Sequence, residues 1–275
     1  MYDIEKKAGA LRKKFIKTAY VVEATHVASS LSCIDIITAL FFGGVLRYDP
    51  AAPLDEGRDR FILSKGHAAV ALYNALCEAG FFTREELHTY CKPGSIFGGH
   101  PSPVIPGIEC ATGALGHGLP FAAGTALALR LKKSDSLVYV ITGDGECQEG
   151  SVWEAAMSIA HFALTNLIWI IDSNKLQLTG SVNAAMRLEP LDKKLKAFGF
   201  DVIKADGHSC RELADILMVD RNRLPEKPIA VIANTIKGKG ASALENKTDS
   251  HIKMLTREEY RAAFKEFGIP DEEAL

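Results

Sequence analysis

Short apolar runs that end in polar, glycine-containing turns and lead into helical stretches constrain the fold of this chain most strongly. Residues 137–141 form such a run, and the turn GDGE (143–146) follows it. An Asp-Gly pair between two strands would predict a β-hairpin. The stretch from Val152 to Leu164 is instead nearly continuously apolar and free of turn residues, which favours a buried helix. The turn therefore connects a strand to a helix.

The same order of strand, turn and helix recurs along the chain. We expect strands at 60–63, 137–141, 167–171, 200–204 and 228–233, and helices at 4–23, 33–46, 121–131, 152–164, 190–198, 210–220 and 256–266, with a further helix that ends at Gly80. This alternation predicts an α/β fold: a doubly wound, mostly parallel sheet with helices on both faces, the first two helices covering the sheet. We expect residues 1–275 to form a single domain with a partly helical extension at 240–275. The Gly/Pro-rich segment 92–120 is expected to be a binding loop.

The charge balance argues against several classes of function. The 32 basic and 34 acidic residues are interspersed and give a net charge of −2, which indicates no binding surface for nucleic acid or anionic membranes. The six cysteines lack C-x-x-C spacing, which favours free thiols in a reducing compartment. The N-terminus lacks the apolar core of a signal peptide, and no apolar run reaches the roughly 18 residues of a membrane span. We therefore expect a cytoplasmic protein.

Four predicted strand ends carry the polar residues of a candidate site: SKGH (64–67), GDGE (143–146), DSNKL (172–176) and NTIKGKG (234–240). In a doubly wound sheet, ligands bind at the carboxyl ends of the strands. Asp144 and Asn174 are thirty residues apart, which is one crossover unit, and would supply oxygen ligands for a hard cation beside His67. Mg²⁺ favours one carboxylate together with ligand phosphates, so a diphosphate is implied. Taken singly, Asp144 and Asn174 could equally be turn formers or helix N-caps.

Several of these segments resemble the transketolase family. Two stretches are similar to the thiamine diphosphate motif in its transketolase form, namely GDGECQEGSVWEA from Gly143 and IIDSNKLQLTG from Ile170. Two other stretches of this chain, RFILSKGHAAVALYNAL and CATGALGHGLPFAAGTALA, are similar to two further transketolase segments and occur in the same chain order. The resemblance covers most of the chain and implies the N-terminal, diphosphate-binding half of a transketolase.

The resemblance implies a role for each matching residue. Asp144, Asn174 and the main-chain carbonyl of Leu176 would bind a Mg²⁺ or Ca²⁺ ion that bridges the diphosphate of the cofactor. The residues implied to contact the cofactor are His67, Gly113, Ala114, Leu115, Gly145, Glu146, Asn174 and His251. The implied catalytic set is His26, His100 and Glu149, with both histidines facing the hydroxyls of a sugar substrate. Glu149 and Glu154 match acidic residues that link two active sites at the dimer interface of the family.

Some of these residues also fit simpler roles. His100 lies beside Pro101 and could be an ordinary loop histidine, and His117 could pack against protein or touch the cofactor. A solvent-exposed stripe on one helix would also account for Glu154, Ser158 and His161.

The chain also departs from the family pattern at three positions. Ala28 and Ser29 stand where glycines are expected near the substrate, and Ile252 replaces the glycine that usually follows the histidine matched by His251. A methyl and a hydroxymethyl group at Ala28 and Ser29 would narrow or re-polarise the substrate pocket.

The resemblance also implies a partner. In transketolases, the glutamate that activates the cofactor belongs to a pyrimidine-binding domain that follows the matched half, and no such domain follows in these 275 residues. We therefore expect one subunit of a split transketolase that transfers a two-carbon ketol unit from a ketose phosphate to an aldose. The partner subunit would bring the pyrimidine-binding domain, in an α₂β₂ assembly. The alternatives are a subunit of an acyloin-forming or pyruvate-using thiamine enzyme, and a non-catalytic binding subunit.

Overall fold

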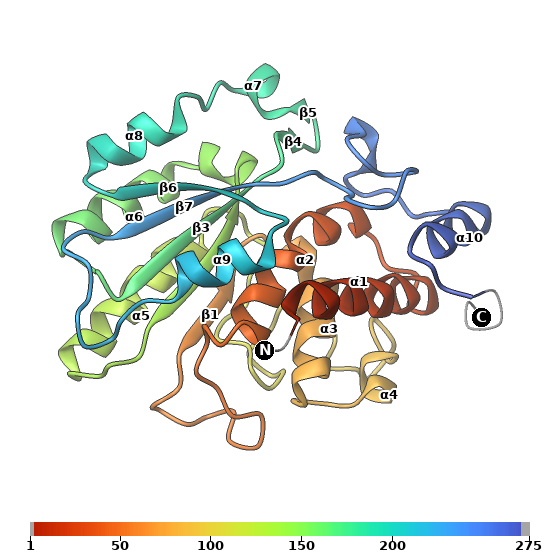
Figure 1. Ribbon diagram of the computed structural model, residues 1–275, viewed down its shortest axis with the longest axis horizontal. Coiled ribbons are helices and arrows are strands. Elements are labelled where there is room, and N and C mark those ends of the chain that lie inside the picture. The colour runs from red at the N-terminus through yellow and green to blue at the C-terminus, as the bar shows by residue number, and fades with distance from the viewer. Residues whose placement is uncertain (1–2, 271–275) are drawn as a thin grey trace.

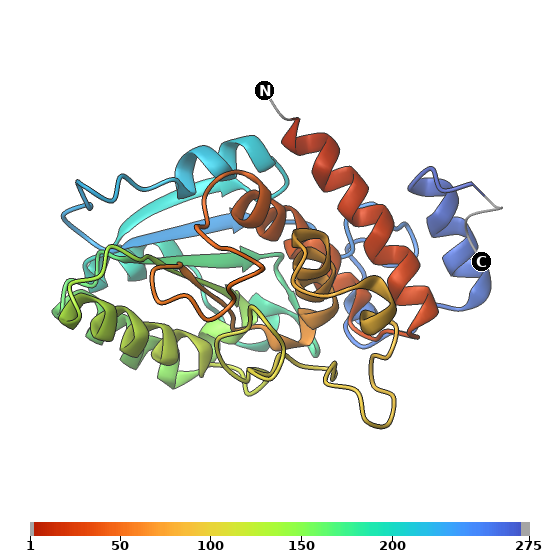
Figure 2. The same ribbon diagram turned by 90° about the horizontal axis from the view of Figure 1, so that it is seen from below.

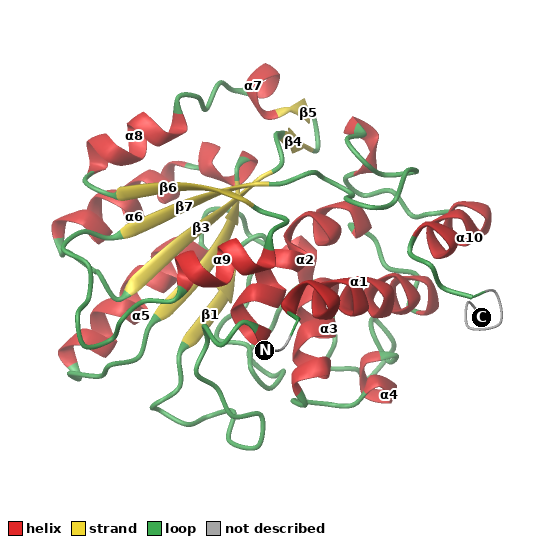
Figure 3. Ribbon diagram, in the orientation of Figure 1, coloured by secondary structure: helices red, strands yellow, loops and turns green. Residues whose placement is uncertain are grey.

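The computed structural model describes residues 3–270, so residues 1–2 and 271–275 of the predicted domain lie outside the described part. Five strands form one sheet in the order β1-β2-β3-β7-β6 (Figures 1 and 3). Their bounds are Arg60–Leu63 (β1), Val138–Gly143 (β2), Leu167–Ser173 (β3), Asp201–Asp206 (β6) and Ile229–Asn234 (β7). All neighbouring strands in this sheet run parallel, which confirms the predicted fold class.

Helices cover both faces of the sheet, because the apolar side chains of each strand alternate between two cores. On β3, Ile168 and Ile170 face one core, whereas Leu167, Trp169 and Ile171 face the other. The first core is shared with α2 (Val27–Phe42), α3 (Ala69–Ala79) and α9 (Cys210–Leu217). The second core is shared with α5 (Gly118–Leu131), α6 (Gly150–His161) and α8 (Leu191–Phe198). Helices on both faces of a parallel sheet are the doubly wound arrangement.

Two expectations about the first helices are wrong. The second helix was expected at 33–46, but α2 begins at Val27, and the serines of its first turns are buried rather than forming a loop. The helix α1 (Ile4–Val21) packs mainly against α2, α3, α9 and α10 (Arg257–Glu266) instead of covering the sheet. Figure 2 shows α1, in red, to one side of the sheet. The helix α1 thus forms an outer layer over α2, which is apolar and buried along almost its whole length.

The remaining segments connect these elements. Between Cys91 and His117 the chain forms neither helix nor strand, but the loop expected over 92–120 ends earlier because α5 already begins at Gly118. The short α4 (Arg84–Leu87) precedes this loop. After β3 comes a small hairpin that the sequence did not indicate, made of β4 (Leu176–Gln177) and β5 (Gly180–Ser181), with α7 (Val182–Ala185) following. Single 3₁₀ turns occur at Gly66–Ala68, Gly145–Gln148 and Thr248–Ser250. Among the described residues, no helix is both long and apolar enough to cross a lipid bilayer.

Candidate functional site

The parallel register brings the polar turns after four strands to one edge of the sheet. The amide of Ser64 donates to the carbonyl of Ile141 at 2.8 Å, which ties the turn after β1 to β2. The amide of Asp144 donates to the carbonyl of Asp172 at 3.1 Å, and thereby joins the turn after β2 to the end of β3. This edge therefore gathers the segments that carry the predicted site residues.

A fully buried ion pair forms the floor of this edge. The ammonium group of Lys65 contacts the carboxylate of Asp172 and also donates to the carbonyl of Ser29 at 3.0 Å. Asp172 accepts two further hydrogen bonds, from the hydroxyls of Ser32 (2.6 Å) and Thr235. Burial alone would raise the pKa of Asp172, but the charge of Lys65 and these donors hold it below its usual value. The pair thus connects β1, β3, β7 and the start of α2.

The structure brings the two residues predicted as side-chain metal ligands together. The carboxylate of Asp144 accepts from the amides of Gly145 (2.9 Å) and Lys175 (2.6 Å), and Lys175 is the neighbour of Asn174. The amide oxygen of Asn174 accepts from the main-chain N–H of Leu176 at 3.1 Å. Burial, and then the charge of Asp172, raise the pKa of Asp144 to about 6.

Metal binding at this edge would need donors of mixed kind. Within residues 3–270, no three histidine, cysteine or acidic side chains form a cluster that could hold a metal ion. A hard cation bound by Asp144 and Asn174 would therefore take its remaining oxygens from the main chain and from a bound ligand, as Mg²⁺ commonly does.

Three predicted histidines form a cluster above this floor. The ring centroids of His26, His67 and His251 lie 5.0 to 5.5 Å apart. The ammonium nitrogen of Lys237 lies 2.9 Å from Nδ1 of His251, and Lys237 is fully buried. The turn that carries Lys237 was expected at this edge, but no role was expected for its side chain; the one signal in the sequence was a lysine in a strand-end turn.

Burial and mutual repulsion control the charges in this cluster. Burial, followed by the charge of Lys65, lowers the pKa of His67 well below its usual value. Burial, followed by the charge of Lys237, lowers the pKa of His251 to about 3. Burial, followed by Lys65, lowers the pKa of Lys237 to about 8. Near neutral pH the cluster therefore offers uncharged imidazoles, which donate and accept hydrogen bonds, next to a lysine cation.

The binding loop closes against the turn after β1. Gly113 has φ +130° and lies so close to His100 that an added Cβ would be 2.5 Å from Cδ2 of the ring. A Cβ on Gly66 would lie 2.7 Å from the amide nitrogen of Gly113. His100 is exposed, and its carbonyl accepts a hydrogen bond from the hydroxyl of Tyr73 at 2.8 Å. These contacts place the loop that contains Gly113 beside the turn after β1.

The carboxylate of Glu146 is already occupied by donors of the chain itself. It accepts from the hydroxyl of Ser64 and from the amides of Gly116 (2.9 Å) and Gly143 (3.0 Å). Burial raises its pKa. The geometry therefore suits a residue that holds the loop and the strand ends in place.

The predicted interface residues Glu149 and Glu154 both lie at α6, Glu149 as its N-cap. Glu149 is exposed at the N-terminus of α6, and Glu154 is exposed on that helix. Glu154 and Ser158 line a groove of about 340 Å³ between α5 and α6, together with apolar residues such as Phe162.

Two buried oxygen atoms at the edge lack a hydrogen-bond partner among the described residues, namely Thr112 Oγ1 and Gln177 Oε1. Each of them borders a glycine turn: a Cβ on Gly66 would lie 2.7 Å from the first oxygen, and a Cβ on Gly145 would lie 3.0 Å from the second. Buried polar atoms are normally paired, so a polar ligand that reaches these turns would satisfy them. The lysine cation, the neutral imidazoles and the glycine turns, whose main chain carries no side chain, fit the diphosphate of a cofactor.

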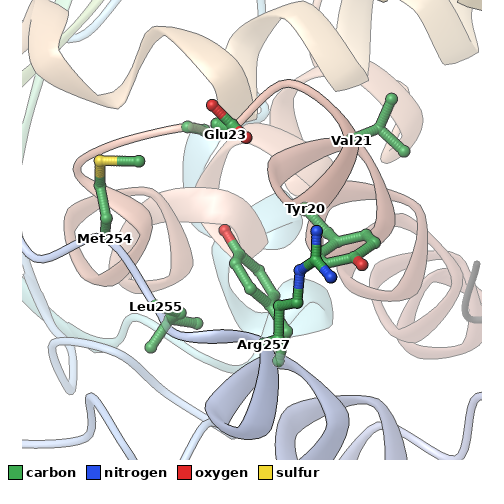
Figure 4. Close-up of a pocket in the computed structure, with 8 residues that line it drawn as sticks. Tyr20, Val21, Glu23, Met254, Leu255 and Arg257 are labelled. Carbon is green, nitrogen blue, oxygen red and sulfur yellow. The ribbon is translucent and has the colours of Figure 1, made fainter.

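A cavity of about 300 Å³ lies next to the histidine-bearing segments, between the end of α1 and the start of α10 (Figure 4). Two of the residues that line this cavity, Ala24 and Met254, lie close in the chain to His26 and His251. The hydroxyl of Tyr260, in the same wall, is buried and has no hydrogen-bond partner in the described part of the chain.

Two of the three residues that depart from the family pattern, Ala28 and Ser29, are buried in the first turn of α2, whereas the third, Ile252, is exposed. The carbonyl of Ala28 accepts from the amide of Gly238 at 3.0 Å, and the carbonyl of Ser29 accepts from Lys65. The main chain at both positions therefore supports the site, whereas the hydroxyl of the next residue, Ser30, is buried without a partner among the described residues.

Comparison with known proteins gives this site a family context. The chain matches the family model described as transketolase, thiamine diphosphate binding domain, over residues 5–275. An apulose-4-phosphate transketolase subunit of Phocaeicola vulgatus is 42% identical over 257 residues, which cover 93% of this chain and 90% of that protein. The 6-deoxy-6-sulfo-D-fructose transketolase subunit of a Clostridium species is 39% identical over 265 residues, with 96% of each chain covered.

Solved structures agree with these relatives. The crystal structure of transketolase from Campylobacter jejuni superposes with a TM-score of 0.90 and 31% identity. The match covers 98% of this chain but only 43% of that enzyme. The chain thus spans less than half the length of the full-length transketolases that it resembles in structure.

Proposed function

The chain belongs to the transketolase family, as its thiamine diphosphate-binding domain, and from this premise we propose that it is the cofactor-binding subunit of a heteromeric transketolase. Its reaction is the transfer of a two-carbon ketol unit from a ketose to an aldose. The observation that carries the proposal is the convergence of Asp144, Asn174, His67 and Lys237 at one edge of the sheet. All of these residues belong to one diphosphate-binding domain.

The residues at this edge have separate roles in cofactor binding. Asp144, Asn174 and the carbonyl of Leu176 would hold a Mg²⁺ or Ca²⁺ ion, and the backbone of Gly145 would face the diphosphate. His67 and His251 would bind the phosphates as neutral donors, while Lys237 would supply the positive charge. Thiamine diphosphate supplies the carbon nucleophile that carries the two-carbon unit, and the protein supplies position and electrostatics.

The substrate would meet His26, which lies beside the two phosphate-binding histidines, and His100 in the binding loop. Nδ1 of His26 lies 2.9 Å from the hydroxyl of Thr25, which fixes the orientation of the ring. Burial, followed by the charge of His100, lowers the pKa of His26, so its imidazole is neutral and can accept a proton. His26 and His100 thereby orient the sugar hydroxyls and exchange protons with them.

The remaining parts of the active site come from partners. A second subunit brings the pyrimidine-binding domain with the glutamate that activates the cofactor. The groove between α5 and α6, which Glu154 lines, is where two copies of this chain associate in an α₂β₂ assembly, with Glu149 at the N-terminus of α6. The names of two relatives carry apulose-4-phosphate and 6-deoxy-6-sulfo-D-fructose, so we assign this enzyme a ketose with a terminal anionic group. All six cysteines are free, which suits a reducing cytoplasm.

The proposal is tested by recovering the complex and assaying it. The tagged chain is purified from its native extract, bound proteins are identified by mass spectrometry, and thiamine diphosphate is measured in the eluate. We expect the cofactor together with a partner subunit, and ketol transfer that Asp144→Ala abolishes while the exposed control Glu56→Ala does not. A complex that retains full activity with Asp144→Ala would refute the assigned site.

A further inference from the structure

The segment that carries Lys237 is held on both sides of this lysine by side chains from distant parts of the chain. Nε2 of His208 accepts a hydrogen bond from the amide of Ile236 at 2.8 Å, one residue before Lys237. Nη1 of Arg12 donates to the carbonyl of Lys239 at 3.0 Å, two residues after it. The direction in which Lys237 leaves the main chain is therefore set by His208 and Arg12.

One carboxylate joins these two side chains. Asp35, in the middle of α2, accepts from Nε of Arg12 at 3.0 Å and also contacts Nη2. Its second oxygen lies 2.7 Å from Nδ1 of His208. Arg12 and Asp35 are both buried, with 9% and 4% of their surface exposed. We call these three residues the Arg12–Asp35–His208 clamp.

The hydrogen bonds define the protonation of His208. The main-chain N–H of Ile236 can only donate, so Nε2 must be the unprotonated acceptor. The ring proton consequently lies on Nδ1 and points to Asp35. Each member of the clamp thus has one defined role, and a second proton on His208 would break its bond to Ile236.

The surrounding backbone leaves the Lys237 segment little freedom. Gly238 adopts φ +76° and donates to the carbonyl of Ala28 at 3.0 Å. The turn that presents His208 packs tightly on the same segment, because a Cβ on Gly207 would collide with the side chain of Thr235. A buried Arg, Asp and His triad is weak evidence for stability, since apolar residues would often stabilise a core as well. Its specific contacts on either side of Lys237 indicate a positioning role instead.

We propose that the Arg12–Asp35–His208 clamp is a positioning device that aims the ammonium group of Lys237 at the diphosphate of the bound cofactor. The inference rests on the proposed function, because it requires the diphosphate to lie beside Lys237. Its three members act through the Lys237 segment and do not contact the cofactor themselves.

The test is a double-mutant cycle measured by calorimetric titration of thiamine diphosphate, in the presence of Mg²⁺, into the full chain co-purified with its partner subunit. We expect His208→Leu and Lys237→Met each to raise the Kd at least tenfold. The double variant should bind no more weakly than Lys237→Met alone, because a misplaced and an absent ammonium group are equivalent. His208→Gln keeps an acceptor near the amide of Ile236 and should recover part of the affinity; it also serves as the test variant if His208→Leu does not fold.

A control separates positioning from loss of stability. Arg221→Leu breaks the Arg221–Asp59 hydrogen bonds (2.6 and 2.7 Å) at the opposite end of the strands. This variant should lower Tm without changing the Kd. Hydrogen exchange on the chain without cofactor should show faster exchange of the amide of Ile236 in His208→Leu but not in the control.

The outcomes are distinguishable. If Lys237→Met binds more weakly but His208→Leu and His208→Gln bind like wild type, or if the two effects in the cycle are additive, the clamp is overturned while the diphosphate site stands. If Lys237→Met leaves the Kd unchanged, the proposed diphosphate site is wrong, and the clamp's role falls with it.

Discussion

The buried pair of Lys65 and Asp172 allows a quantitative prediction about stability. Asp172→Asn keeps the size of the side chain and one acceptor oxygen for the hydroxyls of Ser32 and Thr235, which donate to different oxygens of Asp172, but it removes the negative charge that compensates Lys65. Removing one partner of a buried ion pair costs about 3–5 kcal/mol, because the remaining charge stays buried and unpaired. Lys65 retains acceptors at Ser29 O (3.0 Å) and Ser32 Oγ (3.3 Å), which argues for the lower end of this range.

The expected loss is therefore about 3 kcal/mol in the free energy of unfolding. For a chain of this size, that loss lowers Tm by roughly 6–12 °C. The assay is chemical denaturation followed by circular dichroism, with thermal melts in parallel. A matched control is Glu56→Gln, which breaks the exposed pair with Lys132 and should cost at most about 1 kcal/mol.

The pH dependence tests the cause of the loss. In wild type, the pKa of Lys65 is raised by Asp172 although burial alone would lower it. In Asp172→Asn, burial is no longer opposed, so the pKa of Lys65 in the folded state falls below its value of about 10.4 in the unfolded chain. The unfolded state then binds more protons, and the stability of the variant rises with pH until both states are deprotonated. The deficit relative to wild type should consequently shrink between pH 7 and pH 10.

Two results would refute this reasoning. A loss below about 1 kcal/mol would mean that Lys65 does not depend on Asp172 for compensation. A deficit that does not change with pH would mean that the loss arises from packing rather than from an unpaired charge.

Three further predictions concern single side chains. Lys237→Met should raise the Kd for thiamine diphosphate about 10- to 100-fold, since a hydrogen bond to a charged group contributes roughly 1.5–3 kcal/mol. In wild type the affinity should fall as the pH rises above about 8, where Lys237 loses its proton, and titrations of the variant should lack this pH dependence. Gly113→Ala should lower the free energy of unfolding by more than about 1 kcal/mol in denaturant titrations, because φ +130° and the ring of His100 both oppose a Cβ. Tyr260→Phe should leave the free energy of unfolding unchanged or raise it by up to about 1 kcal/mol. Tyr73→Phe loses a hydroxyl donation that the carbonyls of Gly98 and His100 share, and should lower the free energy of unfolding in the same assay.

The sequence predicted most of the sheet because each buried strand is a short apolar run followed by a polar turn. The start of α2 was missed because the polar residues before Cys33 look like a break in a helix. In the structure these serines are buried, and Ser32 donates to Asp172, a residue 140 positions away. Polar residues that are buried in a helix cannot be recognised without their partners.

The candidate site was predicted where it depends on local turns and missed where it depends on tertiary contacts. Asp144 and Asn174 stand at strand ends that the apolar pattern identifies. Lys237 is fully buried beside His251, but nothing in the neighbouring sequence distinguishes it from an ordinary surface lysine. The clamp is harder still to find, because Asp35 and His208 are 173 residues apart and meet only in the folded chain.

The central claim is that the carboxyl edge of the sheet binds thiamine diphosphate. The most direct measurement is a crystal structure of this chain with its partner subunit, grown with thiamine diphosphate and Mg²⁺. We predict a diphosphate within hydrogen-bonding distance of Lys237 and His67, bridged by a metal ion to Asp144 and Asn174. A diphosphate bound elsewhere, or a cofactor that leaves these side chains without contact, would contradict the claim.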